Sequence, residues 1–429
     1  MENRLSGEIN IESIRALDEQ IREHEIAIAK LKRTRNSLLN VHKLPPEILG
    51  KIFHWNVAFK DGFEGLEKGS HNFLFVCHHW LEDAQCTPEL WSFWGSTTRD
   101  WARWHRRSRV VPLDLVLYVH GDIGLFDAAL RNTLRNHAIR DTIRRIHLRA
   151  VDSKLLSSII SSLTADSQEP RSISVESFIL RKEGSGSVEI SDFFARYRFP
   201  KLQHLELSRC TISPWDLIMS RTPILAVLDL YFAFAPATSQ LLSILASNPT
   251  LRKVSLSGLW EGPSDGGNPS PRVSLHHLED LKLFGDMQGL FGLLHRLDLP
   301  RDMDNLDIKL GRCTPEDISH IIGPYLQDYL RHRGRSQSGL GLYISFERRI
   351  ILHIGDAGVI DFSAPTLARM SSFAAIIIES TQTSQKSRER MILDLITYTP
   401  REEIVRFHTY GEPVTMEDVS TQLPNLKGL

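Results

Sequence analysis

A leucine pattern that recurs along the middle of the chain constrains the fold more than any other feature. The pattern is Leu-x-x-Leu-x-Leu, with Val in place of one leucine, and its four clear copies are Leu202/Leu205/Leu207, Leu225/Leu228/Leu230, Leu251/Val254/Leu256 and Leu278/Leu281/Leu283. The first leucines stand at 202, 225, 251 and 278, so the copies begin 23, 26 and 27 residues apart. A repeat of this length indicates one supersecondary unit that stacks on its neighbours because it cannot bury its apolar face alone.

Three weaker copies flank these four: Ile143/Ile146/Leu148, Val175/Phe178/Leu180 and Met303/Leu306/Ile308. Between copies the apolar residues change to helical spacing, as in residues 155–163. Proline, which ends a helix and favours extended chain, stands two residues before three of the copies, at Pro200, Pro223 and Pro249. Strand and helix in alternation predict parallel strands joined by right-handed crossovers.

These features are typical of leucine-rich repeats, and we expect an irregular α/β solenoid over residues 113–429 that binds partners along one face. The alternation becomes less regular after residue 310. There we expect a hairpin from 342–346 and 350–354 and further strands at 374–378 and 404–408. The last residues, PNLKGL, resemble the start of another repeat, so the solenoid is expected to be incomplete at its C-terminal end.

The first 41 residues predict a long helix. Apolar residues recur at coiled-coil spacing, with His24 and Arg35 interrupting the seam formed by Ile14, Leu17, Ile21, Ile28, Leu31 and Leu38. Two interpretations stay open. The helix pairs with a second copy to form a dimer, or it is an amphipathic helix folded back on the residues that follow.

Residues 42–95 hold three short motifs, LPPEIL, FVCHHW and TPELW. Pro45 or Pro46 suits the first position of a helix, where its missing N–H costs nothing, and Glu47 lies near the positive end of the helix dipole. Apolar residues follow on one predicted helix face and in two short segments: Ile48, Leu49, Ile52, Phe53; Phe75, Val76, Trp80; Leu90, Trp91. About fifty residues cannot bury so many large side chains alone, which favours a partner that covers the surplus.

This segment resembles the F-box, the module by which substrate receptors dock on the Skp adaptor of a cullin–RING ubiquitin ligase. The resemblance rests on four linked elements: Leu44 with Pro45, residues 47–53, residues 76–80 and residues 88–91. The preceding helix, and a following stretch with Arg107, Ser108 and residues 112–115, are similar to F-box proteins of mushroom-forming fungi. One departure is the glycine-containing segment 56–72, where many members of the family have a compact turn.

The resemblance implies a substrate receptor without catalytic activity of its own. It assigns adaptor binding to Leu44, Pro45, Ile48, Leu49, Ile52, Phe53, Val76, Trp80, Leu90 and Trp91, and substrate binding to the solenoid. A docking face must leave apolar area open, so we expect Leu44, Pro45, Ile48, Leu49 and Trp91 to be partly exposed. Three alternatives remain: a scaffold that uses the same modules without a ligase, a helical bundle whose large side chains only fill a core, and an enzyme whose catalytic residues come together from distant positions of the sequence.

Composition favours neither a nucleic-acid nor a membrane partner. Lys and Arg number 51 against 52 Asp and Glu, so the net charge is near zero. Four cysteines lack CxxC spacing, which fits a reducing cytoplasmic or nuclear setting, and no apolar run is long enough to span a bilayer. Catalytic motifs such as G-x-S-x-G are absent from the sequence, and Cys77, His78 and His79 are too few for a zinc site, so we expect no cofactor or metal.

Residues 96–112 are basic and aromatic, and we expect them to form a helix that links the F-box-like segment to the solenoid. Arginines alternate with Trp101 and Trp104 at Arg99, Arg103, Arg106, Arg107 and Arg109, a pattern that can bind nucleic acid through phosphate contacts and stacking. The helical spacing of the tryptophans favours instead a packing role, with the arginines facing water. Arg131, Arg135, Arg140, Arg144 and Arg145 would extend a basic patch only if folding brought them together.

Overall fold

The computed structural model describes residues 2–58, 72–95, 101–108, 111–119, 124–164, 171–231, 237–258, 272–285, 287–300 and 303–310. Beyond these it describes the strands at 340–345, 349–356, 374–379 and 404–410 and the single residues 320, 324 and 327. The chain forms two compact units, Met1–Val116 and Leu117–Leu429. The glycine-containing segment 59–71 and the last residues of the chain, 411–429, lie outside the described residues.

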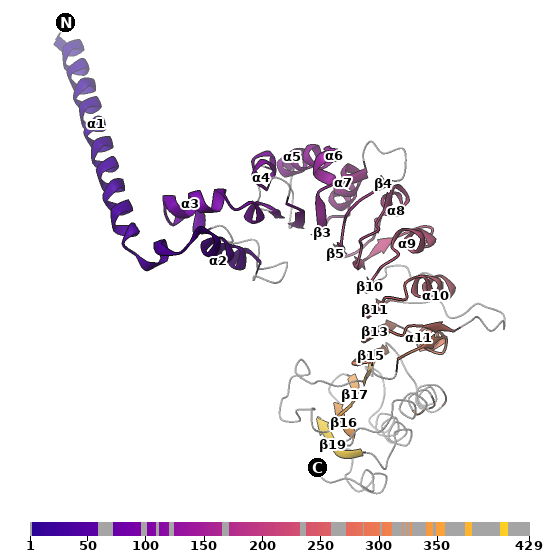
Figure 1. The fold of residues 1–429 in the computed structure, drawn as a ribbon. Coiled ribbons are helices and arrows are strands. Elements are labelled where there is room, and N and C mark those ends of the chain that lie inside the picture. The colour runs from indigo at the N-terminus through magenta and orange to yellow at the C-terminus, as the bar shows by residue number, and fades with distance from the viewer. Residues whose placement is uncertain are drawn as a thin grey trace. The chain divides into compact units, whose positions relative to one another are not determined.

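The first unit is mainly helical (Figure 1). One long helix, α1 (Glu2–Ser37), leads through a 3-10 turn, η1 (Asn40–Lys43), into a group of short elements. Those elements are α2 (Pro46–Ala58), η2 (Asn72–Phe75), α3 (His78–Gln85), η3 (Pro88–Trp91), β1 (Phe93–Gly95) and α4 (Trp101–Ser108). Strand β1 pairs in parallel with the start of β2 (Leu113–Val119), opposing Phe93 to Asp114.

The second unit is built on a large sheet in which seven parallel strands lie side by side in chain order. They are β3 (Ile143–Ala150), β5 (Ser177–Lys182), β8 (His204–Ser208), β10 (Val227–Tyr231), β11 (Lys253–Ser257), β13 (Asp280–Gly285) and β15 (Asn305–Leu310). The sheet continues with β18 (Ala374–Glu379), β17 (Arg349–Asp356), β16 (Leu340–Ser345) and β19 (Ile404–Tyr410). Strands β16 and β17 form the expected hairpin, because they are consecutive and antiparallel.

Helices connect the parallel strands and lie on one side of the sheet (Figure 1). They are α5 (Gly124–Arg135), α6 (His137–Arg140), α7 (Ser153–Thr164), α8 (Ser191–Arg196), α9 (Asp216–Arg221), α10 (Thr238–Ser247) and α11 (Met287–Leu294). Three short parallel pairs accompany them: β4 (Arg171–Ser172) with β7 (Tyr197–Arg198), β6 (Val188–Glu189) with β9 (Cys210–Thr211), and β12 (Val273–Ser274) with β14 (Leu297–Asp298). The fold is therefore mixed α/β, with a long N-terminal helix and a large parallel sheet.

The leucine pattern sets the register of this sheet. Leu205, Leu228, Val254 and Leu281 are direct partners on four neighbouring strands, and each is at most 1% exposed. This confirms the predicted parallel pairing of these four residues. In each of the seven copies all three apolar residues are buried. Their side chains fill the space between the sheet and the helices.

Buried polar residues end two of the connecting helices directly before a proline. Asn248 follows α10, and its side-chain Nδ2 donates to the Ile244 carbonyl at 2.9 Å; Thr222 follows α9, and its Oγ1 donates to the Ile218 carbonyl at 2.7 Å. Both side chains are fully buried. Each side chain adds a hydrogen bond to a carbonyl of the last helical turn, and the Ile218 carbonyl also accepts the backbone N–H of Thr222. The next residue, proline, cannot continue the helix.

Truncation of one buried leucine tests this register. We expect Leu228→Ala to lower the free energy of unfolding by roughly 2–5 kcal/mol, because the alanine leaves a cavity between packed strands. Urea unfolding followed by circular dichroism measures the change. Lys253→Ala, an exposed substitution on the neighbouring strand β11, should change the same quantity by less than about 0.5 kcal/mol. An equal effect of the two substitutions would contradict the buried register.

Candidate functional site

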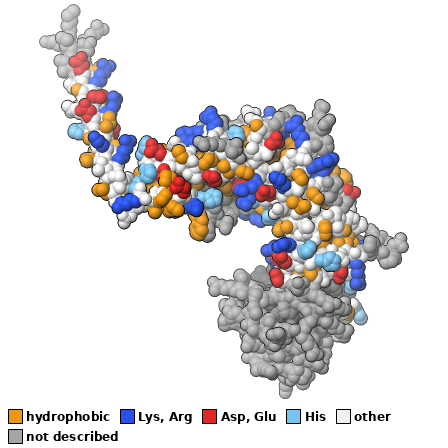
Figure 2. Space-filling model, in the orientation of Figure 1, with side chains coloured by type: hydrophobic (Ala, Val, Ile, Leu, Met, Phe, Trp, Pro, Cys, Tyr) orange, Lys and Arg blue, Asp and Glu red, His pale blue; other side chains and the backbone are white. Residues whose placement is uncertain are grey.

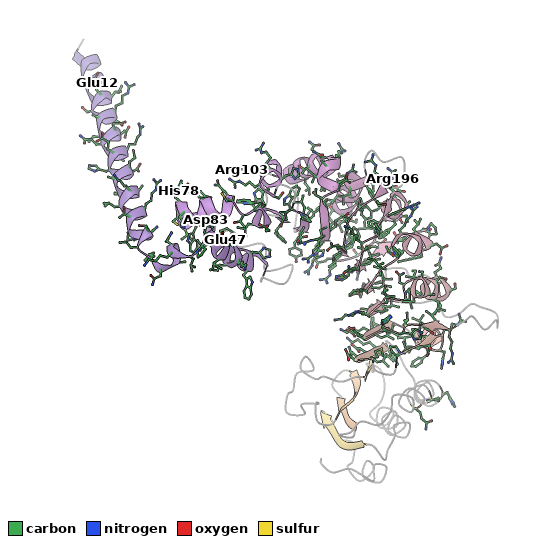
Figure 3. The ribbon with its side chains drawn as sticks, viewed as in Figure 1. Glu12, Glu47, His78, Asp83, Arg103 and Arg196 are labelled. Carbon is green, nitrogen blue, oxygen red and sulfur yellow. The ribbon has the colours of Figure 1, made fainter. Side chains whose placement is uncertain are left out.

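The F-box-like residues form the small helical part of the first unit. Helix α2 begins at Pro46, one residue after Pro45, and Glu47 lies in its first turn, as the sequence predicts (Figure 3). The second motif divides between η2 and α3, with His78 and Asp83 on α3. The third motif forms η3, whose first residue is a proline.

Four of the ten predicted docking residues belong to the buried core of this unit. Leu49, Phe53, Leu90 and Trp91 are at most 1% exposed and pack with Phe73 and Ala84. The rings of Phe53 and Phe73 stack with centroids 4.5 Å apart, and the Trp80 ring lies 5.1 Å from Phe53. The indole Nε1 of Trp91 donates to the Ala84 carbonyl at 2.7 Å, which satisfies the one polar atom of this buried ring.

The expectation that Leu49 and Trp91 are partly exposed is therefore wrong, whereas it is confirmed for Pro45 and Ile48, which are exposed, and for Leu44, which is half-buried. Each helical residue turns by about 100°, so neighbours in the sequence do not share one face. Leu49 and Phe53, four residues apart, point into the core.

An apolar stripe on α2 stays exposed beside this core. Ile48 is 40% exposed, Ile52 46% and Trp55 62%, and their spacing of four and three residues places them on one side of the helix. Phe75, at the end of η2, and the following Val76 are 87% and 56% exposed. Figure 2 shows hydrophobic side chains gathered at the surface where α2 and α3 lie in Figure 1. We call Ile48, Ile52, Trp55, Phe75 and Val76 the apolar surface.

Burial assigns the predicted residues to two roles. Leu49, Phe53, Leu90 and Trp91 hold the unit together, Ile48, Ile52 and Val76 belong to the apolar surface, and Leu44 and Trp80 are half-buried against the core. Trp55 was missed by the sequence analysis, although its position seven residues after Ile48 is the signal that places it on the same face.

A groove adjoins the apolar surface on the other side of Trp55. It has a volume of about 640 Å³ and lies between α2 and the segment from the end of α3 to η3, with Glu47, Lys51, His54, Asp83 and Glu89 among its lining residues. A Cβ atom on Gly50 would lie 3.3 Å from Thr87 Oγ1, so the glycine permits close approach of the two walls. The groove thus offers charged groups beside an apolar face, as the rim of a protein interface does.

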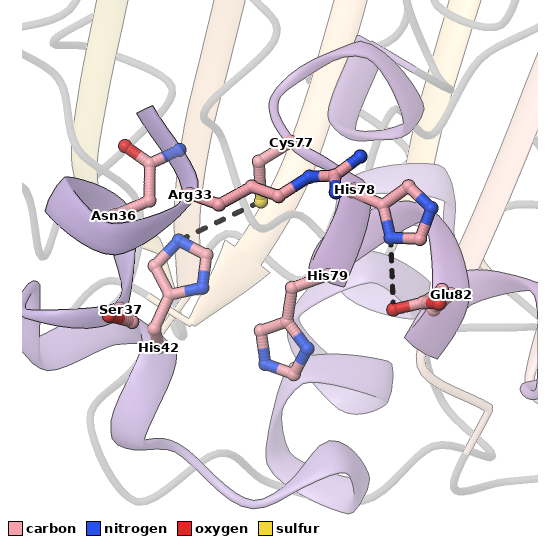
Figure 4. A pocket seen from close by; sticks show the side chains of 8 residues that line it. All are labelled: Arg33, Asn36, Ser37, His42, Cys77, His78, His79 and Glu82. Atoms are coloured by element: carbon pink, nitrogen blue, oxygen red, sulfur yellow. Dashed lines mark hydrogen bonds and ion pairs between the residues drawn. The ribbon is translucent and has the colours of Figure 1, made fainter. Parts of the chain in front are cut away.

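A second pocket, of about 360 Å³, lies where the end of α1 meets η1 and α3 (Figure 4). Cys77 Sγ lies 3.7 Å from His42 Nε2, and the His42 and His79 rings have centroids 5.2 Å apart. His78 pairs with Glu82 at 3.1 Å and His79 with Asp83 at 3.4 Å, both within one turn of α3. Among the described residues no three His, Cys, Asp or Glu side chains are arranged to hold a metal ion.

One arginine of the basic cluster near α4 packs against an aromatic ring of the core. The guanidinium carbon of Arg107 lies 4.3 Å from the centre of the Trp91 ring, and the Trp104 ring meets Trp91 edge-on at 5.2 Å. Arg103 and Arg106 are exposed, while Arg99, Arg109 and the Trp101 side chain lie outside the described residues. In the second unit, buried Arg140 donates to the Leu163 carbonyl at 2.5 Å and to the Tyr197 hydroxyl at 3.0 Å, so it does not face a phosphate.

The strand residues between the buried leucines form the other candidate surface, which we call the central row. Register aligns its members as His147, Ile179, Glu206, Asp229, Ser255, Lys282 and Asp307. Arg181 Nη2 donates to Glu206 Oε2 at 2.9 Å. Burial, assisted by the charge of Glu206, raises the pKa of Asp229, and burial likewise raises that of Asp307. Within the row Ile179 and Glu206 are buried, Asp229 and Asp307 are half-buried, and Lys282 is exposed, so its carboxylates are partly desolvated and its cation is not.

His147 is the most perturbed group of the central row. Burial, with smaller contributions from His204, Arg145 and Arg181, lowers the pKa of His147 from 6.5 to about 4. The imidazole Nε2 lies 2.9 Å from the Ser177 hydroxyl. The folded protein therefore keeps this ring neutral at pH values where an unfolded chain protonates it.

Comparison of the chain with protein-family models and with curated proteins found no match. Within the part of the chain that the structure describes, no helix is long and apolar enough to cross a membrane.

Protonation of a buried histidine on unfolding has a measurable consequence. Because the unfolded chain binds the proton at His147 first, the free energy of unfolding should fall by up to roughly 3 kcal/mol as the pH drops from 6.5 to 4. We expect His147→Gln, which keeps a hydrogen-bonding group but does not titrate, to weaken this dependence in urea unfolding at several pH values. Identical pH profiles for His147→Gln and the wild type would contradict the assignment.

A charged substitution in the helical core tests whether α2 has one buried face and one exposed face. We expect Leu49→Arg to unfold this part of the first unit, because a charge at a fully buried position costs several kcal/mol. Six of the chain's eight tryptophans, at positions 55, 80, 91, 94, 101 and 104, lie in the first unit, so its unfolding should shift tryptophan emission to the red. Ile52→Arg, on the exposed face of the same helix, should leave the emission unchanged.

Proposed function

We propose that the chain is a substrate receptor of a cullin–RING ubiquitin ligase. In this proposal the first unit docks on a Skp-type adaptor, and through it on a cullin, while the second unit is a leucine-rich-repeat solenoid that holds a protein substrate. The chain performs no chemistry itself. It raises the effective concentration of the substrate near the subunits that transfer ubiquitin, which is a gain from proximity.

The observation that carries the proposal is the division of the F-box-like motifs into a core and an exposed apolar surface. Leu49, Phe53, Leu90 and Trp91 fill the core, and yet Ile48, Ile52 and Val76 from the same motifs stay open to solvent, together with Trp55 and Phe75. A motif whose only role were to fill a core would bury these residues too. Aromatic and aliphatic side chains gathered beside a charged groove are typical of the centre and rim of a protein interface.

The parallel sheet supports the substrate-binding half of the proposal. The same seven strands that bury one row of apolar side chains carry the central row, so substitutions in that row need not disturb the leucine core. Glu206 and Asp229 provide negative charge, while Arg181 and Lys282 provide positive charge nearby. We infer that a folded protein or peptide with both charge signs is the class of substrate that this surface recognises.

Two positive charges on the apolar surface test adaptor docking. We expect Ile48→Arg combined with Ile52→Arg to weaken binding to a purified Skp-type adaptor at least a hundredfold, because docking would bury unpaired charges. The measurement is calorimetric titration of the full-length chain, with circular dichroism melting of the same samples. The melting curve should stay unchanged, since both residues are exposed in the free chain.

The matched control is Ile224→Arg. Ile224 is 38% exposed, much like the two isoleucines of α2, but it lies in the second unit. It should bind the adaptor as the wild type does. A well-folded wild-type chain that binds no Skp-type adaptor would overturn the ligase proposal and leave a binding scaffold. Equal binding by the double variant and the wild type would show that the adaptor uses a different face.

A further inference from the structure

Helix α1 carries an apolar stripe that the described part of the chain leaves exposed. The helix has 36 residues, and its large apolar side chains are among the most exposed of the chain: Ile14 50%, Leu17 58%, Ile21 55%, Ile28 50% and Leu31 70%. The fold-back interpretation requires these residues to be buried against the F-box-like segment, and the structure does not show that packing. Figure 2 shows hydrophobic side chains along the helix among charged ones.

The stripe has the chemistry of a two-stranded coiled coil. Counting in heptads, Ile14, Ile21 and Ile28 occupy the first core position, while Leu17 and Leu31 occupy the second with His24 between them. In parallel coiled coils, isoleucine at the first core position with leucine at the second favours two strands over three or four. The occupant that fits this pattern is a helix with the same pattern in the same register.

We propose that a second copy of this chain pairs with α1 in parallel and in register over residues 14–31. In that arrangement Ile14, Leu17, Ile21, Ile28 and Leu31 each meet their own equivalent, and His24 forms the single polar layer. At 1.5 Å per residue the paired segment is about 26 Å long. The proposal concerns self-association and does not depend on adaptor binding.

Charges beside the seam favour the parallel arrangement over the antiparallel one. In the parallel pair the flanking contacts join Ser13 to Asp18, Gln20 to Glu25 and Ala27 to Lys32 of the partner helix, and none of them joins like charges. An antiparallel pair over the same layers would place Asp18 beside Glu25 twice. Like charges at flanking positions are destabilising, so the parallel register is preferred.

Substitution within the stripe tests the pairing. Light scattering of the full-length chain, up to roughly 100 µM, should give twice the mass of one chain. Ile21→Glu combined with Ile28→Glu should give the mass of one chain, because four carboxylates would enter the seam. The control is Ile26→Glu: Ile26 is 65% exposed but lies on the outer side of the helix, so this variant should remain a dimer.

Two further substitutions test the polar layer at His24 and the parallel direction of the helices. His24→Leu should lower the dissociation constant of the dimer roughly tenfold, since it removes two poorly accommodated polar groups from the seam. Leu17→Cys should form an interchain disulfide under mild oxidation, above the background of the wild-type cysteines, because only a parallel pair sets position 17 against itself.

Three outcomes would overturn the proposal. They are a wild-type chain that has the mass of one chain at every concentration, a double glutamate variant that remains a dimer, and an Ile26→Glu variant that dissociates as the double variant does. A dimer without the Leu17→Cys crosslink would overturn the parallel register.

Discussion

The structure of the second unit depends on the in-register contact between buried leucines of neighbouring parallel strands. A single strand and helix would leave Leu228 and its two companions open to water, and only the neighbouring copies remove that surface. The connecting helices, the proline-terminated helix ends and the short strand pairs all serve this one requirement, because each returns the chain to the start of the next strand. Stability is thus shared between neighbours.

In the first unit the controlling constraint is the rotation of 100° per helical residue. It lets α2 contribute Leu49 and Phe53 to a core while Ile48 and Ile52, on an adjacent face, remain in contact with water. The aromatic rings of Phe53, Phe73 and Trp80 fix the position of α2 against η2 and α3. A rigid core beneath the exposed side chains limits the entropy that binding would cost.

Most strands of the large sheet could be predicted from the sequence, since each leucine copy marks one strand and a parallel register follows from the repeat. The candidate site was less accessible. The motifs identify the residues, but their division into buried and exposed groups depends on the helix phase. The apolar pattern alone predicts one face for Ile48, Leu49, Ile52 and Phe53, whereas Leu49 and Phe53 are buried and the other two are exposed. Contacts such as that between His42 and Cys77, which are 35 residues apart, depend on tertiary packing that no local pattern encodes.

The alternation of buried and open residues within the strands has an evolutionary consequence. In β15, every second side chain is buried and the others are half-buried, so packing uses one set of positions and leaves the other set partly open to solvent. Mutations can therefore accumulate on the open positions while selection retains the apolar ones. Under the proposed function, single substitutions at the open positions would change binding specificity without first passing through a less stable intermediate.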